Sequence, residues 1–119
     1  MSDGNKEKRE MTMGILNKYI DEIKPIFGDG LKKVILYGSY ARNDFDADSD
    51  IDIMLIIDGE EKNARRHNDL LTNIEVRINL ENNVVLIPII MNKEKFLKYE
   101  NVIPFYRNVA REGVILYEQ

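Results

Sequence analysis

Two aspartates, Asp50 and Asp52, lie at the start of an apolar run over residues 51–57 that otherwise has the composition of a buried strand. Residues two apart on a strand point to the same face, so both carboxylates are expected on one face, about 6.6 Å apart along the strand. A buried carboxylate without a partner is costly, so a cation is expected to meet them. Magnesium prefers a few carboxylates together with substrate phosphates, and a pair of ions about 3.5–4 Å apart would clamp the oxygens exchanged in phosphoryl transfer.

A Gly-Ser pair, Gly38 and Ser39, precedes the two aspartates. Gly38 ends a predicted strand, where the absence of a Cβ lets the backbone approach a phosphate. Ser39 is placed to cap the turn SYAR, whose N-terminal amides would form an anion site. Arg42 follows about one turn later, within reach of the same phosphates. The plainer alternatives stay open at this point: a pure cap for Ser39 and a surface position for Arg42.

The acidic segment DADSDID, residues 46–52, also allows two other interpretations. A solvated acidic loop accounts for its early aspartates but not for Asp52, which falls inside the apolar run. An EF-hand loop starting at Asp46 would need glycine at its sixth position and glutamate at its twelfth, where this chain has Ile51 and Ile57. The calcium-loop interpretation is therefore excluded.

The elements that must position these residues follow from apolar periodicity. Helices are predicted over residues 12–24, 60–81, 93–99 and 104–112, and strands over residues 34–37, 51–57, 84–91 and 114–117. Pro25 is expected to end the first helix, Pro88 to place its strand at an edge or a bulge, and Asn92 to cap the third helix. Gly113 is expected to stop the last helix, and the third strand to be covered on both faces. Helices that alternate with mostly buried strands predict an α/β or α+β layer around a mixed sheet.

The bulk composition limits the class of protein. The chain has 119 residues, no cysteine and a formal net charge of -4, so we expect no disulfides and no binding to bare nucleic acid. Its longest apolar run is too short to cross a bilayer. The first residues, MSDGNKEKRE, have no signal-peptide core. The expectation is a cytoplasmic protein with a flexible polar tail over residues 1–11 and one domain over residues 12–119.

Gly38-Ser39, ten intervening residues and Asp50-x-Asp52 resemble the GS-x10-DxD signature of the DNA polymerase β-type nucleotidyltransferase superfamily. The residues after the Gly-Ser pair, YAR, and the segment SDIDIML are similar to the minimal nucleotidyltransferases of bacteria and archaea. The segments IPIIMNKEKF and PFYRNVAREGVILYE also resemble the closing segments of that family. The resemblance spans roughly residues 34–118. It implies an α+β fold with a mixed sheet of about four strands flanked by helices.

The resemblance also implies an activity. Gly38, Ser39 and Arg42 would hold a nucleoside triphosphate, and Asp50 and Asp52 would be the catalytic carboxylates that bind two magnesium ions. The reaction would transfer a nucleoside monophosphate, commonly AMP from ATP, to a hydroxyl acceptor with release of pyrophosphate. Many relatives act with a HEPN-domain protein as a toxin–antitoxin pair, and the acceptor in members of that kind is a tyrosine of the partner. The protein would then form a hetero-oligomer with such a partner, or a homo-oligomer with further copies of itself.

One departure from the family pattern concerns a third carboxylate, which the superfamily usually carries on the strand matching residues 84–91. This chain has no acid between Glu81 and Glu94. Either two carboxylates suffice, or Glu75 or Glu81 substitutes from the preceding helix, or catalysis is weak or lost. The alternative function is a catalytically inactive antitoxin that neutralises a HEPN-type partner by binding, and a third interpretation is a structural module with an incidental acidic loop.

Overall fold

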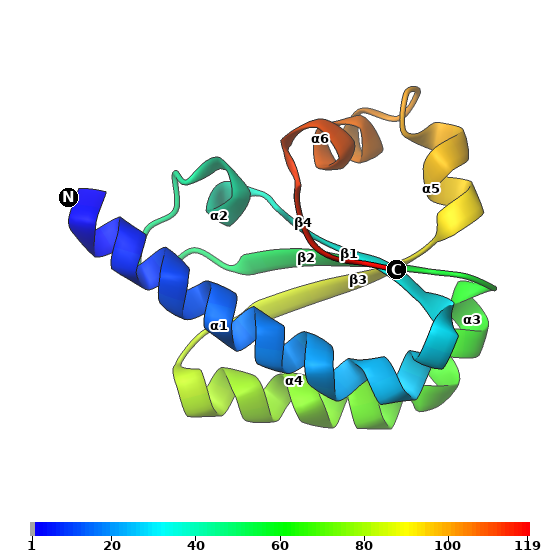
Figure 1. Ribbon diagram of the computed structural model, residues 1–119, viewed down its shortest axis with the longest axis horizontal. Helices are drawn as coiled ribbons and strands as arrows, with labels where there is room; N and C mark the ends of the chain where they lie inside the picture. Colours follow the sequence, from blue (N-terminus) through cyan, green and yellow to red (C-terminus); the bar gives the residue numbers. More distant parts are fainter. Residues whose placement is uncertain (1) are drawn as a thin grey trace.

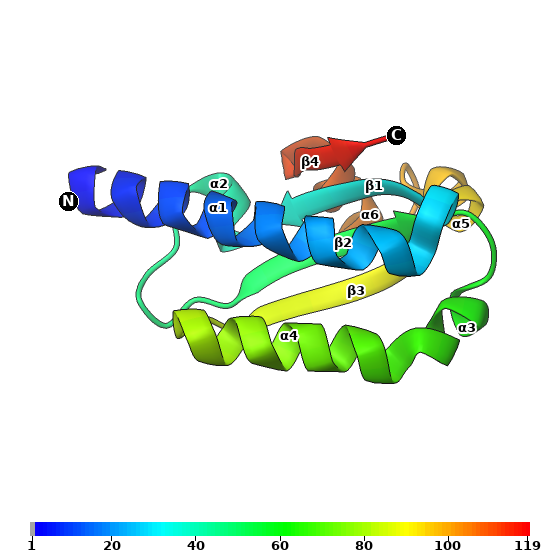
Figure 2. The same cartoon turned by 60° about the horizontal axis from the view of Figure 1, so that its bottom comes forward.

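A four-stranded mixed sheet forms the centre of the protein, which a computed structural model describes over residues 2–119. The strands are β1 (Leu31–Tyr37), β2 (Ile51–Ile57), β3 (Leu86–Asn92) and β4 (Val114–Glu118). Their order across the sheet is β3-β2-β1-β4, which Figure 2 shows from its lower to its upper edge. β1 pairs antiparallel with β2 and β4, whereas β3 runs parallel to β2. The mixed sheet expected from the sequence is confirmed.

Helices cover both faces of the sheet. The helical elements are α1 (Ser2–Phe27), η1 (Gly28–Gly30), α2 (Ser39–Arg42), α3 (Glu61–Ala64), η2 (Arg65–His67), α4 (Asn68–Asn82), α5 (Lys93–Tyr99) and α6 (Pro104–Glu112). Figure 1 shows α1 and α4 on one side of the sheet and α5 and α6 on the other, with α2 on the α6 side. None of the helices in the described part of the chain is long and apolar enough to cross a bilayer. The architecture is α+β.

The first helix is longer than the sequence predicts. A flexible tail is expected over residues 1–11; residue 1 lies outside the described residues, and residues 2–11 belong to α1 instead of a flexible tail. Lysine, arginine, glutamate and methionine dominate this segment and are good helix formers, so the helix extends although none of residues 5–11 is buried. The helix also continues through Pro25 to Phe27, since a proline so close to the C-terminus removes one hydrogen bond while Phe27 still packs against the core.

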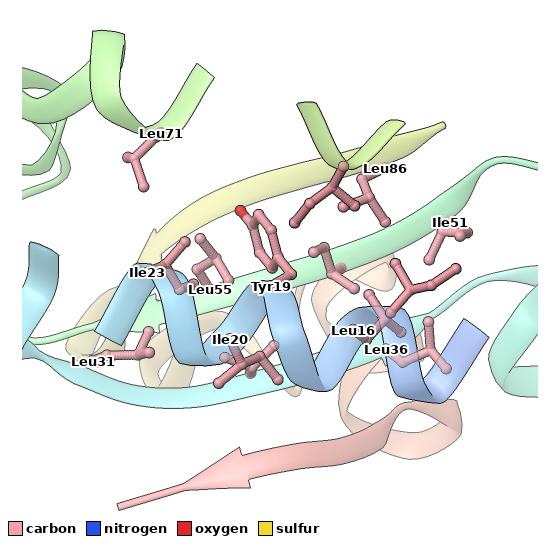
Figure 3. Packing of buried hydrophobic residues seen from close by; sticks show 14 of the residues in the cluster. Leu16, Tyr19, Ile20, Ile23, Leu31, Leu36, Ile51, Leu55, Leu71 and Leu86 are labelled. Carbon is pink, nitrogen blue, oxygen red and sulfur yellow. The ribbon is translucent and has the colours of Figure 1, made fainter. Parts of the chain in front are cut away.

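The larger core lies between the sheet and the helices α1 and α4 (Figure 3). One stripe of α1 is buried against the sheet, with side chains at helical spacing: Ile15, Leu16, Tyr19, Ile20 and Ile23. The sheet side chains that meet this stripe alternate along the strands and include Leu36 of β1 and Leu55 of β2. The opposite face carries a smaller cluster, in which Met54 of β2 meets Phe96 of α5 and Val109 of α6. Both faces of β2 are thus covered over most of its length, which fixes its register.

Several boundaries differ from the prediction. The helix expected over residues 60–81 is divided into α3, η2 and α4, and α4 ends at Asn82 with Asn83 in the left-handed region (φ 52°). Pro88 lies on an edge strand, as predicted, because β3 pairs with β2 alone. The expectation that this strand is covered on both faces is wrong, since Ile87 is exposed. An edge strand has one free side, and Ile87 stays exposed although its neighbour Leu86, on the opposite face, is buried.

The predicted starts of the last two helices are correct. The side chain of Asn92 caps α5 by accepting a hydrogen bond from Lys95 N–H at 2.9 Å, and α6 begins at Pro104. Gly113 ends α6, but its φ of -68° is one that any residue adopts. The requirement for glycine is steric, because a Cβ there would collide with Ile35 Cγ2 and with the carbonyl oxygen of Val109. This close approach holds the end of α6 against β1.

We expect Gly113→Ala to destabilise the protein by about 1–3 kcal/mol, the usual cost of adding a methyl group where the packing has no space for it. Urea unfolding of the variant and the wild-type protein measures this loss. Gly14→Ala is the matched control, because Gly14 lies in α1 and a Cβ added there would have no contact within 4 Å. This change should instead stabilise the helix by about 0.5–1 kcal/mol. Equal effects of the two substitutions would contradict the steric explanation.

Candidate functional site

The segment after β1 forms a tight turn around Gly38. Gly38 has φ 76° and ψ -154°, a conformation that favours glycine, and it is the residue before the single helical turn α2. Arg42 N–H donates to the carbonyl oxygen of Gly38 at 3.1 Å, and Asp44 N–H donates to that of Ser39 at 3.0 Å. Asn43, in the left-handed region, ends the turn. The chain therefore leaves the sheet, makes one helical turn and returns toward β2.

The capping role expected for Ser39 is wrong. Gly38 occupies the capping position and Ser39 is the first residue of α2, with no side-chain cap hydrogen bond in this turn. A capping side chain must precede the first helical turn, and the positive φ at Gly38 shifts the start of α2 by one residue relative to the prediction. The Ser39 hydroxyl is thus not used to satisfy the helix start.

Gly38 and Asp52 lie in direct proximity. A Cβ at Gly38 would collide with Asp52 Oδ2 and would lie 3.3 Å from Asp52 Cγ. The strand register explains this closeness, because Tyr37, the last residue of β1, is the cross-strand partner of Asp52. The positive φ of Gly38 favours glycine at this position, and a side chain there would have to displace the carboxylate of Asp52. The structure therefore brings together the two halves of the motif, the Gly-Ser turn and the aspartates.

Asp50 and Asp52 come from the start of β2. Asp52 is partly buried and lies on the same face as Met54 and Ile56, the face covered farther along by α5 and α6. Asp50, one residue before the strand, is exposed. The two carboxylates are close enough to interact, as the charge of Asp50 acts on Asp52. The same-face arrangement predicted from strand geometry agrees with this interaction.

The negative charge of Asp52 is only partly compensated by its surroundings. Burial raises the pKa of Asp52, the neighbouring charge of Asp50 raises it further, and the charge of Arg42 opposes them. The pKa of Tyr37 is raised to about 12, first by burial and then by the charge of Asp52. The negative charge of Asp52 is therefore partly buried and also acts on Tyr37, and a cation at the same place would stabilise it.

Arg42 lies next to this site but is held by two acids. Its Nε is 3.1 Å from Asp44 Oδ2, and its Nη1 is 3.7 Å from Glu112 Oε2 at the end of α6. The hydrogen bond and charge of Asp44, together with Glu112, raise the pKa of Arg42. Arg42 is therefore more than an isolated surface arginine, although its side chain is exposed. No signal in the sequence near Glu112 points to this contact, since the two residues are brought together by the docking of α6.

The strand beside the two aspartates carries no acid. Asp52 is the register partner of Ile87, and Ile51 N–H donates to the carbonyl oxygen of Val85 at 2.8 Å, so Val85 lies beside Asp50. Val85 and Ile87 are 51 % and 37 % exposed. These two residues occupy the positions from which a third carboxylate would reach the site. Within residues 2–119, no group of three acidic, histidine or cysteine side chains is placed to hold a metal ion.

The two glutamates considered as substitutes lie elsewhere. Both belong to α4, on the face of the sheet opposite Asp52 (Figure 1). Glu75 acts on Tyr19 of α1, whose pKa its charge raises in addition to a larger effect of burial. Glu81 pairs with Arg77 at 3.4 Å. Because the sheet separates them from Asp52, neither glutamate can replace the third acid.

Asp50 and Asp52 are the described carboxylates best placed to hold a metal. Magnesium takes one or two protein carboxylates and completes its coordination with water and substrate phosphates, which suits a site with two acids beside an open turn. Gly38 has no side chain, so a phosphate-bearing ligand that reached this turn would meet its backbone. The geometry suits metal-assisted transfer of a phosphoryl-type group.

Comparison with known proteins agrees with this chemistry. Residues 21–119 match the family model described as "Polymerase beta, Nucleotidyltransferase". A candidate protein adenylyltransferase of Methanocaldococcus jannaschii, MJ0604, is 33 % identical over 102 residues, which cover 86 % of this chain and 94 % of the relative. A second one from the same organism, MJ0141, is 33 % identical over 79 residues, covering 66 % of this chain and 78 % of the relative.

Solved structures share the fold. A candidate nucleotidyltransferase from Sulfolobus solfataricus superposes with a TM-score of 0.59 at 16 % identity, covering 97 % of this chain and 87 % of that structure. A mutant of the toxin–antitoxin pair MntA-HpeT contains a chain that matches with a TM-score of 0.53 at 16 % identity, covering 87 % of this chain and 73 % of that one. The family model, which accounts for most of the chain, and the level of identity to the relatives show that this protein belongs to the polymerase β-type nucleotidyltransferase family.

Proposed function

We propose that the protein transfers AMP from ATP, with magnesium, to a hydroxyl group of an acceptor protein. The observation that carries the proposal is the proximity of Gly38 and Asp52, which places a glycine turn beside two interacting carboxylates. Two relatives that bear the name protein adenylyltransferase, at 33 % identity, support AMP and a protein acceptor. Use of a nucleoside triphosphate and a divalent metal is general in this family.

Each residue of the site has a role in this reaction. The backbone at Gly38 and Ser39, together with Arg42, binds the triphosphate, while Asp50 and Asp52 hold the metal. A bound magnesium ion supplies positive charge to the phosphates and to the departing pyrophosphate. The acceptor oxygen forms a bond to the α-phosphorus as the bond from that phosphorus to the α,β-bridging oxygen breaks. With Val85 and Ile87 at the neighbouring strand, no protein carboxylate takes the hydroxyl proton, which passes to solvent.

The acceptor is proposed to come from a partner protein, specifically of the HEPN type. The edge of the sheet at β3 is open beside the carboxylates, so a large acceptor can approach there. The structural match to a member of a toxin–antitoxin pair supports a protein partner. The chain would then act as the antitoxin that modifies its toxin.

A second function has its own supporting observation. Val85 and Ile87 stand where a third acid would activate the hydroxyl, which favours a binding protein that keeps a nucleotide site without turnover. In that case the chain would silence its partner by complex formation alone. An assay of AMP transfer to the partner separates the two functions.

The metal site predicts that ATP binds with magnesium and that Asp52→Asn abolishes the binding, because the metal loses its more buried ligand. Isothermal titration calorimetry with and without magnesium measures the ATP affinity of both proteins. The variant should melt at a temperature at least as high as that of the wild-type protein, since the raised pKa of Asp52 means that its charged form costs folding free energy above the pKa. Asp58→Asn, at the far end of β2, is the control and should bind ATP normally. Unchanged affinity in Asp52→Asn would refute the metal site.

The proposed reaction predicts an AMP adduct on the partner. The protein is co-expressed with its candidate HEPN-type partner, the complex is incubated with ATP and magnesium, and intact mass is measured. A shift by one AMP is expected, and it should disappear in Asp50→Asn. A base normally contributes about 10²–10⁴-fold, so transfer without one should be slow but detectable. A complex that silences the partner with no adduct would favour the binding-only function.

The register of β3 predicts which substitutions speed up the transfer. A carboxylate introduced by Ile87→Asp, beside Asp52, or by Val85→Asp, beside Asp50, should act as a base and raise the rate by up to about 10²-fold. Ile115→Asp on β4, an apolar position away from the site and as exposed as Val85, is the control. Rates of adduct formation at saturating ATP provide the comparison. If neither strand β3 variant exceeds the control while ATP binding is intact, the assignment of these positions is wrong.

A further inference from the structure

The two ends of helix α6 contact Tyr37 and Arg42, the residue before and the last residue of the turn over residues 38–42, which is the proposed phosphate-binding turn. The ring of Phe105, in the first turn of α6, packs edge-on against the ring of Tyr37, with centroids 5.6 Å apart. At the other end of α6, Glu112 Oε2 lies 3.7 Å from Arg42 Nη1. Tyr37 precedes Gly38 and Arg42 ends α2, so one helix touches the residue before the turn and the last residue of it.

The position of Glu112 is fixed by the residue that follows it. Gly113 N–H donates to the carbonyl oxygen of Val109 at 2.9 Å, and a Cβ at Gly113 would lie 3.4 Å from the carbonyl oxygen of Leu36. Leu36 is also the register partner of Val114, the first residue of β4. The end of α6 is therefore packed against the end of β1, directly before the turn that contains Gly38. This packing determines where the Glu112 carboxylate can reach.

Stability of the helix does not explain a glutamate at this position. Glu112 is the last residue of α6, and a negative charge is unfavourable at a helix C-terminus, where the backbone dipole is negative. Arg111, the residue before it, carries a positive charge, which is favourable at this end of the helix. Glu112 also gains little as an exposed ion pair, since such pairs contribute weakly to folding. The contact with Arg42 therefore offers a better explanation for a glutamate at position 112 than the stability of the helix does.

We propose that Glu112 is a positioning residue for nucleotide binding, which together with Asp44 holds the guanidinium of Arg42 at the phosphate-binding turn. The two acids engage Nε and Nη1, so Nη2 is directed to donate to a phosphate oxygen. A guanidinium is planar and rigid, so fixing two of its nitrogens fixes the third. The inference rests on the proposed function, because Arg42 has a phosphate to bind only if the nucleotide occupies the site.

The test is a double-mutant cycle on ATP affinity, measured by calorimetry with magnesium. We expect Glu112→Gln to weaken ATP binding about two- to fivefold, the range that an exposed ion pair can supply. The same substitution should have no further effect in an Arg42→Ala background, because the residue that it positions is gone. The melting temperature of Glu112→Gln should equal or exceed that of the wild-type protein, as the unfavourable charge at the helix end is removed.

The matched control is Glu118→Gln, which breaks the ion pair of Glu118 with Lys33 at 3.1 Å on β4 and should leave ATP affinity unchanged. If the wild-type protein binds ATP but Glu112→Gln binds it equally well, or weakens it equally in the Arg42→Ala background, the positioning role is refuted and the proposed function stands. A wild-type protein that binds no ATP with magnesium overturns the proposed function and the positioning role together.

Discussion

The contact between Gly38 and Asp52 is the constraint on which the arrangement of the site depends. It requires a glycine with positive φ at the end of β1 and a carboxylate at the second position of β2. The antiparallel register that pairs Tyr37 with Asp52 brings them together, and that register is maintained because side chains on both faces of β2 are buried in separate clusters. A slip by one residue would exchange the two faces and move the carboxylate to the side of α1 and α4. The core packing and the functional site are thus set by the same pairing.

The site carries negative charge that the fold compensates only in part. Asp52 is partly buried next to Asp50, and Arg42, whose charge acts on Asp52, is itself paired with Asp44 and Glu112. Such an arrangement costs some folding free energy and in return provides a place where a cation gains from binding. The neighbouring strand adds no further acid, so the charges that act on Asp52 are those of Asp50, beside it at the start of β2, and of Arg42, at the end of α2.

Local features of the sequence predicted the elements closest to the site well. The apolar run over residues 51–57 gave the bounds of β2 correctly, Pro88 marked an edge strand, and Asn92 marked a helix start. Predictions failed where a tertiary contact or a competing local preference determined the position of an element or of a side chain. The helix-forming residues before Thr12 extended α1, and the positive φ of Gly38 displaced the cap from Ser39. The exclusion of Glu75 and the contact of Glu112 depend on which face of the sheet each helix covers, which no short segment encodes.

Proline at position 88 has a consequence for how other chains can meet this protein. A sheet grows when an incoming strand continues its ladder of backbone hydrogen bonds, and a proline on the outer strand interrupts that ladder because it has no N–H to donate. The border of the sheet next to Asp50 and Asp52 is therefore closed to extension by a strand across position 88. A molecule that approaches from this border must engage side chains, and the opposite border, at β4, is the one that remains open to strand addition.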